Sequence, residues 1–426
     1  MYTKQEILRM VEEEDVEFIR LQFTDAFGTL RNIAVPAGQL DRALSRQFRI
    51  EGSSIREFLW NEDEDVYLYP DPDTFTILPW RPQQGKVARL LCDIYRSDDT
   101  PLSESPRSIL KKVLCRADKL GYTFQVKPEC EFFLFHTDEN GIPTTLTHEQ
   151  AGYLDISPLD LGENARRDMI QTLEEMGFEI ESSHHELAPA QHEIDFHYAD
   201  GISTADRIVT FKSAVRSIAK RHGLHATFMP KPKAGTAGSG MHIHMSLWKD
   251  GRNIFEDADR ENGLSVEAEY FIGGILKHIK GMTVIANPLV NSYKRLISGF
   301  EAPGEINWSV KSSNVLIRAV RRREETVIEL RSPDPSANPY LLLALCLEAG
   351  LWGMEKKILP SEAVNGRDFL PQTLKEAVAA CREDEFIKDV LGEKFLEPYL
   401  AAKEKEWLEY MTQVTDWEIQ EYLYRT

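Results

Sequence analysis

The sequence has little cysteine, no long apolar run and no surplus of basic residues. Its five cysteines (Cys92, Cys115, Cys130, Cys346 and Cys381) are scattered without CxxC spacing. This pattern argues against a zinc finger or a disulfide framework and suits a reducing compartment. No apolar run approaches the length of a membrane-spanning helix, and the first residues contain no apolar signal-peptide core. We therefore expect a cytoplasmic protein that does not enter a membrane.

The charge balance is acidic. The chain has 50 basic and 69 acidic residues, which gives a net charge of −19. A molecule with this charge should not attract nucleic acid or an anionic membrane surface. Any binding of phosphate groups must therefore depend on a local basic site.

The length of 426 residues, 42% of them hydrophobic, favours two or more domains, or one large domain with an appendage. The first part is predicted to be β-rich, with a short helix capped by Thr3, a β-hairpin over 16–35 and strands at 66–69, 75–78 and 87–95. A polar stretch, 96–104, precedes a helix that starts after Ser105 with Pro106 in its first position. We place the domain boundary at residue 103.

The remainder is predicted to alternate helices and strands. Helices are expected over 164–176, 204–221, 339–356 and from 384 to the terminus. Strands are expected over 178–181, 192–196, 225–229, 241–247 and 327–331.

Two glutamates separated by one residue, Glu129 and Glu131, precede the apolar run Phe132–Phe135. Side chains at positions i and i+2 of a strand face the same way, so both carboxylates should point together into the protein. Like charges this close cannot both stay ionised in a poorly hydrated site without a cation. A hard divalent metal ion is the simplest such cation. The alternative is a strand whose acidic face meets water.

Four further segments concentrate polar residues, and each has a structural interpretation when taken alone. A glycine-rich loop is more often a turn than a phosphate-binding loop, and 235–240 fits no Walker or dinucleotide-binding pattern. The segments are His184–Glu186 with Gln191–Glu193, Gly235–Gly240 with Met241–Ser246, Asn291–Arg295 with Glu301–Pro303, and Ile328–Arg331 with Ser332–Tyr340.

Together, the order and content of these segments resemble glutamine synthetase of the bacterial class I type. Runs that carry the resemblance include Leu161–Asn164, Glu174–Ile180 and Gly223–Pro232. The resemblance implies an α+β fold, with a β-grasp-like N-terminal domain over 1–103 and a larger catalytic domain over 104–426 that contains an antiparallel sheet. It also implies a homo-oligomer of two stacked hexameric rings, with each active site at a subunit contact.

The resemblance implies a two-step reaction in which ATP phosphorylates the γ-carboxylate of L-glutamate and ammonia then displaces the phosphate. Two Mg²⁺ or Mn²⁺ ions are expected, one held by Glu131, Glu186 and Glu193 and the other by Glu129, His242 and Glu329. Expected nucleotide contacts are His244 and Ser246, and expected glutamate contacts are Gly238, Arg295 and Arg331. Glu301 matches the flap carboxylate that shields the intermediate, Arg318 matches an arginine near the phosphates, and Glu51 matches an acidic residue that binds ammonium across the subunit contact.

Four positions depart from the family pattern. Glu51 replaces an aspartate, Ala237 an asparagine, and Ser313 and Val327 each replace an arginine near the transferring phosphate. Lys311 and the run Arg321–Arg323 lie near enough in sequence to substitute for those arginines, and the alternative for the run is a solvated loop. Three interpretations stay open: a glutamate–ammonia ligase, a γ-glutamyl amide ligase for a larger amine such as methylamine, ethanolamine or a polyamine, and a weakly active or inactive paralogue with a binding or regulatory role.

Overall fold

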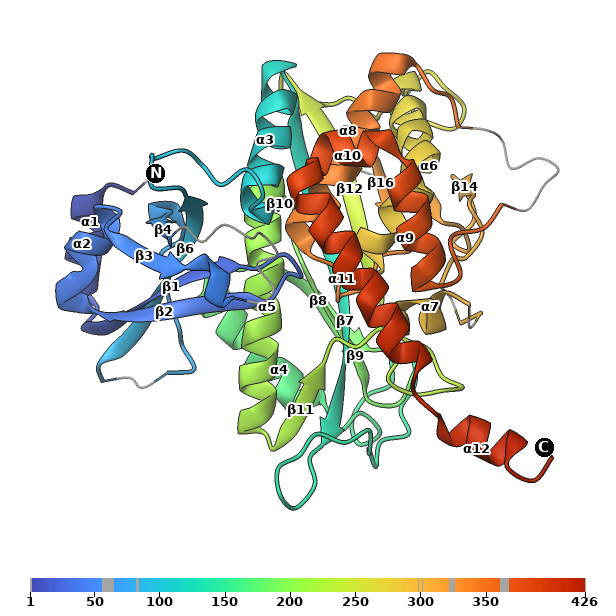
Figure 1. Ribbon diagram of the computed structural model, residues 1–426, viewed down its shortest axis with the longest axis horizontal. Coiled ribbons are helices and arrows are strands. Elements are labelled where there is room, and N and C mark those ends of the chain that lie inside the picture. The colour runs from blue at the N-terminus through green and yellow to red at the C-terminus, as the bar shows by residue number, and fades with distance from the viewer. Residues whose placement is uncertain are drawn as a thin grey trace.

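The computed structural model describes residues 2–55, 65–81, 84–297, 299–300, 302–321, 326–360 and 368–425. Its N-terminal part is a six-stranded sheet in the order β2-β1-β6-β4-β3, with β5 also paired to β6 (Figure 1). The strands are β1 (Val16–Thr24), β2 (Leu30–Pro36), β3 (Phe48–Glu51), β4 (Asp65–Pro70), β5 (Thr76–Ile77) and β6 (Lys86–Tyr95). The predicted hairpin is the antiparallel pair β1–β2, and β1 also pairs in parallel with β6.

Short helices accompany this sheet. They are α1 (Lys4–Glu13), α2 (Leu40–Leu44) and the 3₁₀ turns Ala37–Gln39, Gly52–Ser54 and Pro72–Thr74. The Thr3 hydroxyl accepts a hydrogen bond from the Glu6 amide, and the Glu6 carboxylate accepts one from the Thr3 amide, so α1 begins with the predicted cap. Ile7 of α1 packs with Ile19, Leu21 and Leu90 in a core separate from that of the larger domain.

The larger part contains a ten-stranded sheet in the order β14-β15-β16-β12-β7-β9-β8, with β10 and β11 paired to β7 and β13 paired to β12. All pairs are antiparallel except β14–β15. The strands are β7 (Thr123–His136), β8 (Ile180–His185), β9 (Gln191–Phe196), β10 (Ala199–Asp200), β11 (Leu224–Thr227), β12 (Met241–Lys249), β13 (Arg252–Asn253), β14 (Trp308–Ser309), β15 (Ile317–Arg321) and β16 (Thr326–Leu330).

Helices cover this sheet and bury its apolar side chains (Figure 1). Two of them, α6 and α8, approach closely at glycines: a Cβ atom on Gly353 would lie 2.2 Å from the Tyr270 carbonyl oxygen. The helices are α3 (Pro106–Lys119), α4 (Glu163–Glu175), α5 (Gly201–Arg221), α6 (Val266–Ala286), α7 (Val290–Leu296), α8 (Pro339–Lys356), α9 (Leu374–Glu383), α10 (Glu385–Leu391), α11 (Glu393–Met411) and α12 (Asp416–Tyr422). None of the helices in the described residues is long and apolar enough to cross a membrane.

Two sequence-based expectations need correction. The helix expected from 384 to the terminus is three helices, because Gly392 adopts a φ of 80° between α10 and α11 and the chain leaves helical geometry again before α12. The strand expected over 178–181 starts at Ile180 and continues to His185, so it carries the histidines that precede Glu186.

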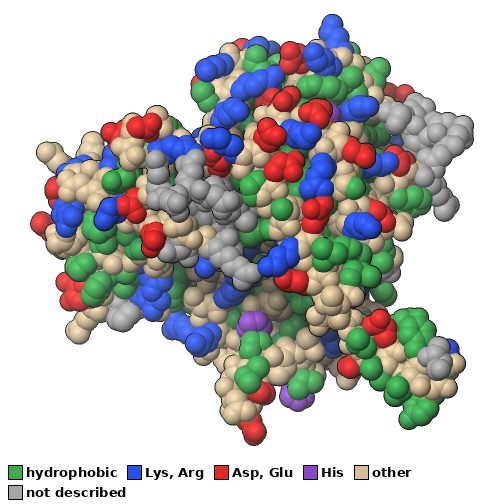
Figure 2. Space-filling model, in the orientation of Figure 1, with side chains coloured by type: hydrophobic (Ala, Val, Ile, Leu, Met, Phe, Trp, Pro, Cys, Tyr) green, Lys and Arg blue, Asp and Glu red, His purple; other side chains and the backbone are tan. Residues whose placement is uncertain are grey.

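The C-terminal helix α12 projects from the body of the molecule and leaves apolar side chains exposed (Figures 1 and 2). Trp417 and Leu423 retain 61% and 64% of their accessible surface. Large apolar side chains normally become buried, so this helix is a candidate contact with another molecule.

Candidate active site

The central strands of the larger sheet bring the predicted acidic and histidine residues to one face. Glu129 pairs with His242 across β7 and β12, Glu131 with Glu193 across β7 and β9, and His244 with Glu329 across β12 and β16. Directly opposed residues of antiparallel strands project to the same side, as do residues i and i+2 of one strand. The side chains of Glu129 and Glu131 therefore point together, as their spacing predicts.

The first cluster contains Glu129, His242 and Glu329, whose potential ligand atoms lie within 4.8 Å of one another. Nδ1 of His242 lies 3.3 Å from Oε2 of Glu129 and 3.4 Å from Oε1 of Glu329. Burial raises the pKa of Glu129, but His244 and His242 outweigh this effect and hold the pKa well below its ordinary value. Oε2 of Glu329 is buried without a hydrogen-bond partner, which fits a group that binds a cation.

The second cluster contains Glu186 and Glu193 together with His184. Nε2 of His184 lies 2.8 Å from Oε1 of Glu186 and 3.5 Å from Oε2 of Glu193. Burial and the neighbouring carboxylates, Asp195 foremost, raise the pKa of Glu193 well above its usual range. Burial also raises the pKa of Glu186, but His184 and the other neighbours of that carboxylate together outweigh burial and lower it, so Glu193 is the carboxylate that resists ionisation in the absence of a cation.

Glu131 lies beside this second cluster, and its carboxylate is already hydrogen-bonded. Its Oε2 accepts from Nε2 of Gln191 at 2.7 Å and from the Gly240 amide at 2.9 Å. Burial, followed by the charge of Glu186, raises the pKa of Glu131 to about 7. Glu186 and Glu193 thus form a compact group with His184, and Glu131 is not a member of that group. The charge of Glu186 nevertheless acts on Glu131, so the three predicted carboxylates influence one another.

The predicted glutamate-binding arginines lie beside these clusters. Arg295 is buried and donates through Nη1 to the Ser332 carbonyl at 2.7 Å and through Nη2 to the Arg331 carbonyl at 3.3 Å. Nε of Arg331 lies 3.6 Å from Oε1 of Glu329. A Cβ atom on Gly240 would lie 2.6 Å from Nη2 of Arg295, so only glycine allows this approach.

Three further predicted residues are Arg318 on β15, Ser246 on β12 and Gly238 in the loop before β12. Arg318 pairs with Glu329 across β15 and β16, and its Nη1 lies 3.8 Å from Oε2 of that glutamate. The hydroxyl of Ser246 is buried and accepts from the Trp248 indole at 3.0 Å. Gly238 packs against the Pro230 carbonyl, which a Cβ atom would approach to 2.2 Å.

Of the last two predicted residues, Glu51 lies on the N-terminal sheet and Glu301 is not among the described residues. Glu51 is exposed at the end of β3, which belongs to the N-terminal sheet and not to the sheet that carries the acidic clusters (Figure 1).

Two of the four positions that depart from the expected pattern, Val327 and Ser313, lie beside Glu329 or its neighbour Arg331. Val327 is fully buried and pairs with Val320 on the same face as Glu329. Ser313 is exposed, and its carbonyl accepts a hydrogen bond from Nη1 of Arg331. Lys311 is also exposed, whereas Arg322 and Arg323 lie outside the described residues.

Three residues at this site had no predicted role: Asp195, which the sequence did not single out, and His184 and Gln191, which it marked only as members of polar segments. Asp195 is two residues after Glu193 on β9, and His184 is two residues before Glu186, so the rule that predicts Glu129 and Glu131 to point together also predicts both of these. Gln191 begins β9 and donates to both Glu131 and the Gly238 carbonyl. It is two residues before Glu193 on the same strand, so the same rule also predicts its side chain on this face.

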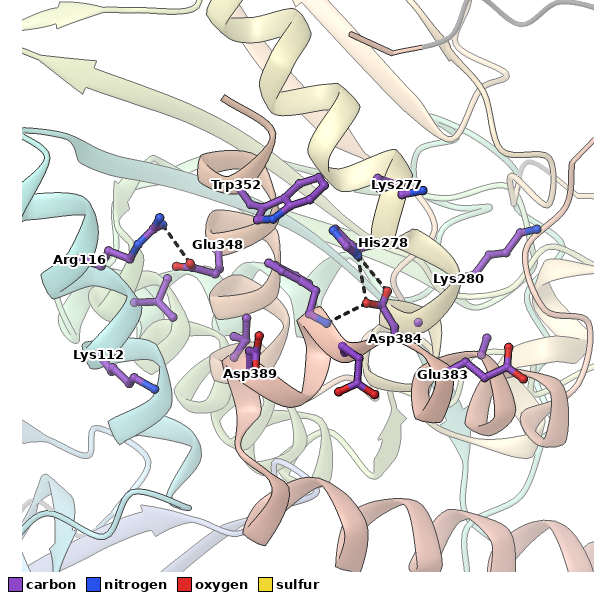
Figure 3. Close-up of a pocket in the computed structure, with 16 residues that line it drawn as sticks. Lys112, Arg116, Lys277, His278, Lys280, Glu348, Trp352, Glu383, Asp384 and Asp389 are labelled. Atoms are coloured by element: carbon purple, nitrogen blue, oxygen red, sulfur yellow. Dashed lines mark hydrogen bonds and ion pairs between the residues drawn. The ribbon is translucent and has the colours of Figure 1, made fainter. Parts of the chain in front are cut away.

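A separate cavity of about 800 Å³ lies between α3, α6, α8, α9 and α10. Figure 3 shows His278 and Asp384 inside it, joined by hydrogen bonds from Nδ1 of the histidine, beside Trp352. The cavity contains none of the predicted active-site residues, and it therefore belongs to a different part of the molecule.

Comparisons with known proteins decide the family. The model of the glutamine synthetase β-grasp domain matches residues 15–97, and that of the glutamine synthetase catalytic domain matches residues 103–422. The glutamine synthetase of Clostridium saccharobutylicum is 54% identical over 437 aligned residues, which cover 99% of both chains. The chain belongs to the glutamine synthetase family. The glutamine synthetase of Staphylococcus aureus strain Mu50 is 49% identical, with 99% of this chain and 98% of its own covered.

Solved structures agree with this family. A GmaS/ADP complex superposes with a TM-score of 0.89 at 33% identity and covers 98% of this chain and 99% of its own. Plasmodium falciparum glutamine synthetase gives a TM-score of 0.90 at 24% identity, with 99% of each chain covered, and so supports the fold alone. Like its relatives, this glutamine synthetase family member is a ligase.

The glutamine synthetase family uses ATP and divalent metal ions, and the residues on this face fit such ions. Two groups of carboxylates with a histidine each offer oxygen and nitrogen ligands of the kind that Mg²⁺ and Mn²⁺ accept. The buried Oε2 of Glu329 and Oδ1 of Asp195 have no hydrogen-bond partner, so the site contains acceptors that a cation would satisfy.

Proposed function

We propose that this chain is a glutamate–ammonia ligase that joins ammonia to the γ-carboxylate of L-glutamate at the expense of ATP, through a γ-glutamyl phosphate. The observation that carries the proposal is the convergence of Glu129, His242 and Glu329 next to Glu186 and Glu193 on one face of the sheet. Clustered carboxylates of this kind are suited to divalent cations, which phosphoryl transfer requires.

The metal ligands we propose are those that the family resemblance assigns. Glu131, Glu186 and Glu193 would hold one Mg²⁺ or Mn²⁺ ion, with His184 close to two of them. Glu129, His242 and Glu329 would hold the other. When bound, these ions would neutralise the charge of the nucleotide phosphates and of the transferring phosphoryl group.

The protein groups around the metals would bind and orient the substrates. Arg295 and Arg331 would hold the carboxylates of glutamate, and Gly238 would contribute a backbone contact to its amino group. His244 and Ser246 would contact the nucleotide, and Arg318 would stabilise the phosphate charge. This assignment is supported by the positions of Arg318 and Arg331 within 4 Å of Glu329.

The second step needs a base and a closed site. Ammonium must lose a proton before it attacks, and the acyl phosphate must be protected from water. Glu301 would supply the flap carboxylate, and Glu51 of a neighbouring subunit would bind ammonium. The exposed position of Glu51 at the end of β3 is compatible with a role across a subunit contact.

We further propose that the chain assembles as a dodecamer of two hexameric rings. The exposed apolar side chains of Trp417 in α12 and of Leu423 directly after it support a contact between subunits. Sedimentation velocity tests this assembly, because Trp417→Asp should dissociate the particle into smaller species if α12 joins the rings.

Ligation of a larger amine is the second candidate, since Glu51 and Ala237 both depart from the family pattern at the substrate side. A weakly active paralogue is the third, because Ser313 and Val327 lack the expected guanidinium groups.

Phosphate release with Mg-ATP, glutamate and a panel of amines separates the three candidates. Turnover with ammonia that exceeds turnover with methylamine, ethanolamine and a polyamine supports the proposal, and Glu329→Gln should abolish it. A response to a larger amine alone would assign the second activity. No phosphate release with any amine, from protein that still binds nucleotide, would refute a ligase function.

A further inference from the structure

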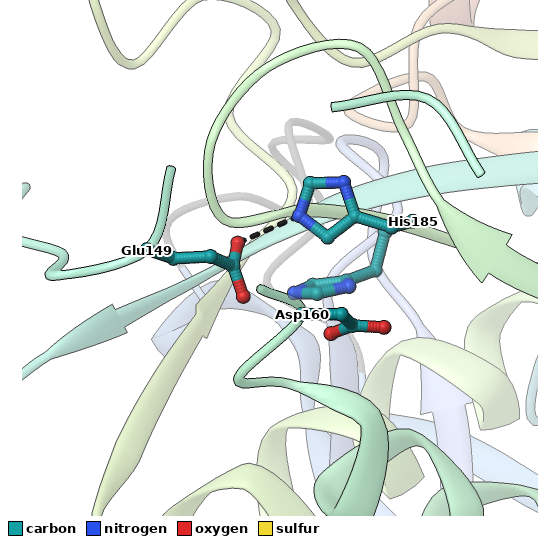
Figure 4. Close-up of side chains that lie close together, drawn as sticks. Glu149, Asp160 and His185 are labelled. Atoms are coloured by element: carbon teal, nitrogen blue, oxygen red, sulfur yellow. Dashed lines mark hydrogen bonds and ion pairs between the residues drawn. The ribbon is translucent and has the colours of Figure 1, made fainter. Parts of the chain in front are cut away.

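Two histidines stand immediately before proposed metal ligands: His185 before Glu186 and His192 before Glu193. Both are fully buried. His192 projects to the side of β9 opposite to Glu193, because successive side chains of a strand alternate. With Glu149 and Asp160 they form a buried cluster behind the site, in which potential ligand atoms lie within 4.8 Å of one another (Figure 4).

This cluster is already filled and does not need a metal ion. Nη1 of Arg166 lies 2.7 Å from Oδ2 of Asp160 and 2.9 Å from Nδ1 of His192, so a guanidinium cation occupies that half. In the other half, both ring nitrogens of His185 face oxygen acceptors, at 2.7 Å from Oε1 of Glu149 and 2.6 Å from the Glu186 carbonyl. An imidazole that donates through both nitrogens has no lone pair for a metal.

The cluster instead holds the turn between β8 and β9, which carries Glu186. Glu149 accepts hydrogen bonds from His185 and from the Ala190 amide at the two ends of this turn. Ala190 has a φ of 69°, a conformation uncommon for a residue with a side chain, so it depends on such external support. The Glu186 amide donates to the Gln191 carbonyl at 2.8 Å and closes the turn.

We propose that Glu149 is a positioning residue for the metal ion held by Glu186 and Glu193, and that it acts through His185 and the backbone of the 186–190 turn. The inference rests on the proposed function. Among the described residues, none of the hydrogen bonds of Glu149 reaches the ligands of the other metal, Glu129, His242 and Glu329. The network should therefore serve one metal site and not the other.

Titration of Mn²⁺ into the full-length protein without substrates, followed by the electron paramagnetic resonance signal of free Mn²⁺, tests this proposal. We expect two classes of site in the natural protein. In Glu149→Gln, one class should bind about tenfold more weakly, as is typical when a partner of a metal ligand is changed, while the other class stays within twofold. Turnover of this variant should return to the natural kcat in excess Mn²⁺, with the KM for ammonia unchanged.

The matched control is Asp384→Asn, which removes the charge of another carboxylate that is hydrogen-bonded to a buried histidine, His278, in the cavity away from the site. It should leave both classes of Mn²⁺ site unchanged. If Glu149→Gln fails to fold, Asp160→Asn perturbs the half of the cluster next to Glu193 and should weaken the same class.

Four outcomes would overturn the positioning role. They are unchanged Mn²⁺ binding in the folded Glu149→Gln variant, equal weakening of both classes, an equal effect in the Asp384→Asn control, and unchanged binding in Asp160→Asn where that variant replaces the first. Absence of Mn²⁺ binding in the natural protein would refute the metal-dependent function itself. The two failures are therefore distinguishable.

Discussion

Arg107, in the first turn of α3, joins the two domains through three aspartates. Its guanidinium is buried and donates to Asp206 of α5 at 3.1 and 2.9 Å, to Asp93 of β6 at 2.7 Å, and to Asp71 at 2.8 Å. Asp71 and Asp93 belong to the N-terminal domain. We predict that Arg107→Met destabilises the protein chiefly by leaving these carboxylates without their shared cation.

The magnitude follows from what remains after the substitution. Removing one partner from a buried ion network costs about 3–5 kcal/mol. Lys111 stays 2.6 Å from Asp93, and the Tyr340 hydroxyl still donates to Asp206 at 2.7 Å. Because these contacts compensate in part, we expect the free energy of unfolding to fall by an amount near the lower end of that range, about 3 kcal/mol.

Urea unfolding followed by circular dichroism measures this loss. With a denaturant slope of about 3 kcal/mol/M, the midpoint should fall by about 1 M. Arg382→Met is the matched control, because that arginine on α9 pairs with Glu404 near the surface, where the two side chains keep 40% and 45% of their accessible surface. An exposed pair contributes less than about 1 kcal/mol. If the two variants shifted the midpoint equally, the assignment of Arg107 as the interdomain contact would be wrong.

The destabilisation caused by Arg107→Met should depend on pH, and it should become smaller as the pH falls. Burial raises the pKa of Asp71, but Arg107 and Lys111 outweigh this and lower it below its ordinary value of 3.8. Such a carboxylate stabilises the folded state above its unfolded pKa, and this contribution is lost as the pH falls through the folded pKa. The difference in midpoint between the natural protein and Arg107→Met should therefore be full at pH 6 and shrink below about pH 4. A difference that stays constant down to pH 3 would contradict the pairing.

Three further predictions concern the site. Gly240→Ala should raise the KM for glutamate at least tenfold, because its Cβ would displace Nη2 of Arg295 from a distance of 2.6 Å; an unchanged KM would separate this arginine from substrate binding. Ser313→Arg should raise kcat about tenfold or more, since one preorganised donor is worth about 3 kcal/mol, and no gain would mean that another cation already compensates. Glu51→Ala should raise the KM for ammonia while γ-glutamyl phosphate formation continues, and unaltered ammonia kinetics would refute its assignment.

Local signals in the sequence predicted the elements that they govern. Thr3 precedes α1 and caps it, and alternation placed Glu129 and Glu131 on one side of β7. These predictions depend on residues close together in the chain. The pairing of Glu131 with Glu193, or of His244 with Glu329, joins strands far apart in sequence, and no periodicity contains that information. The family resemblance supplied it.

Helix α6 shows why other elements escaped prediction. It is buried around most of its circumference, including Phe271, Ile275 and Ile279, so it lacks the alternation of polar and apolar faces that marks a surface helix. Its contact with α8 depends on Gly274 and Gly353, which interrupt helical propensity in sequence but allow close approach in the fold. Packing against the rest of the domain, and not a local sequence pattern, therefore determines where α6 forms.

The family resemblance predicts arginines at two positions where this chain has Ser313 and Val327. Val327 projects on the same face as Glu329 and Arg331, yet it is fully buried and pairs with Val320, so an apolar pair fills the position at which the resemblance predicts an arginine. Arg331 already donates to the Ser313 carbonyl, which leaves Arg318 as the partly exposed cation nearest Glu329 among the described residues. Stabilisation of the negative charge on a transferring phosphoryl group would therefore depend on Arg318 and the bound metals. A site of this composition should be more sensitive to metal concentration than one with a full set of arginines, because the metals carry a larger share of the transition-state stabilisation.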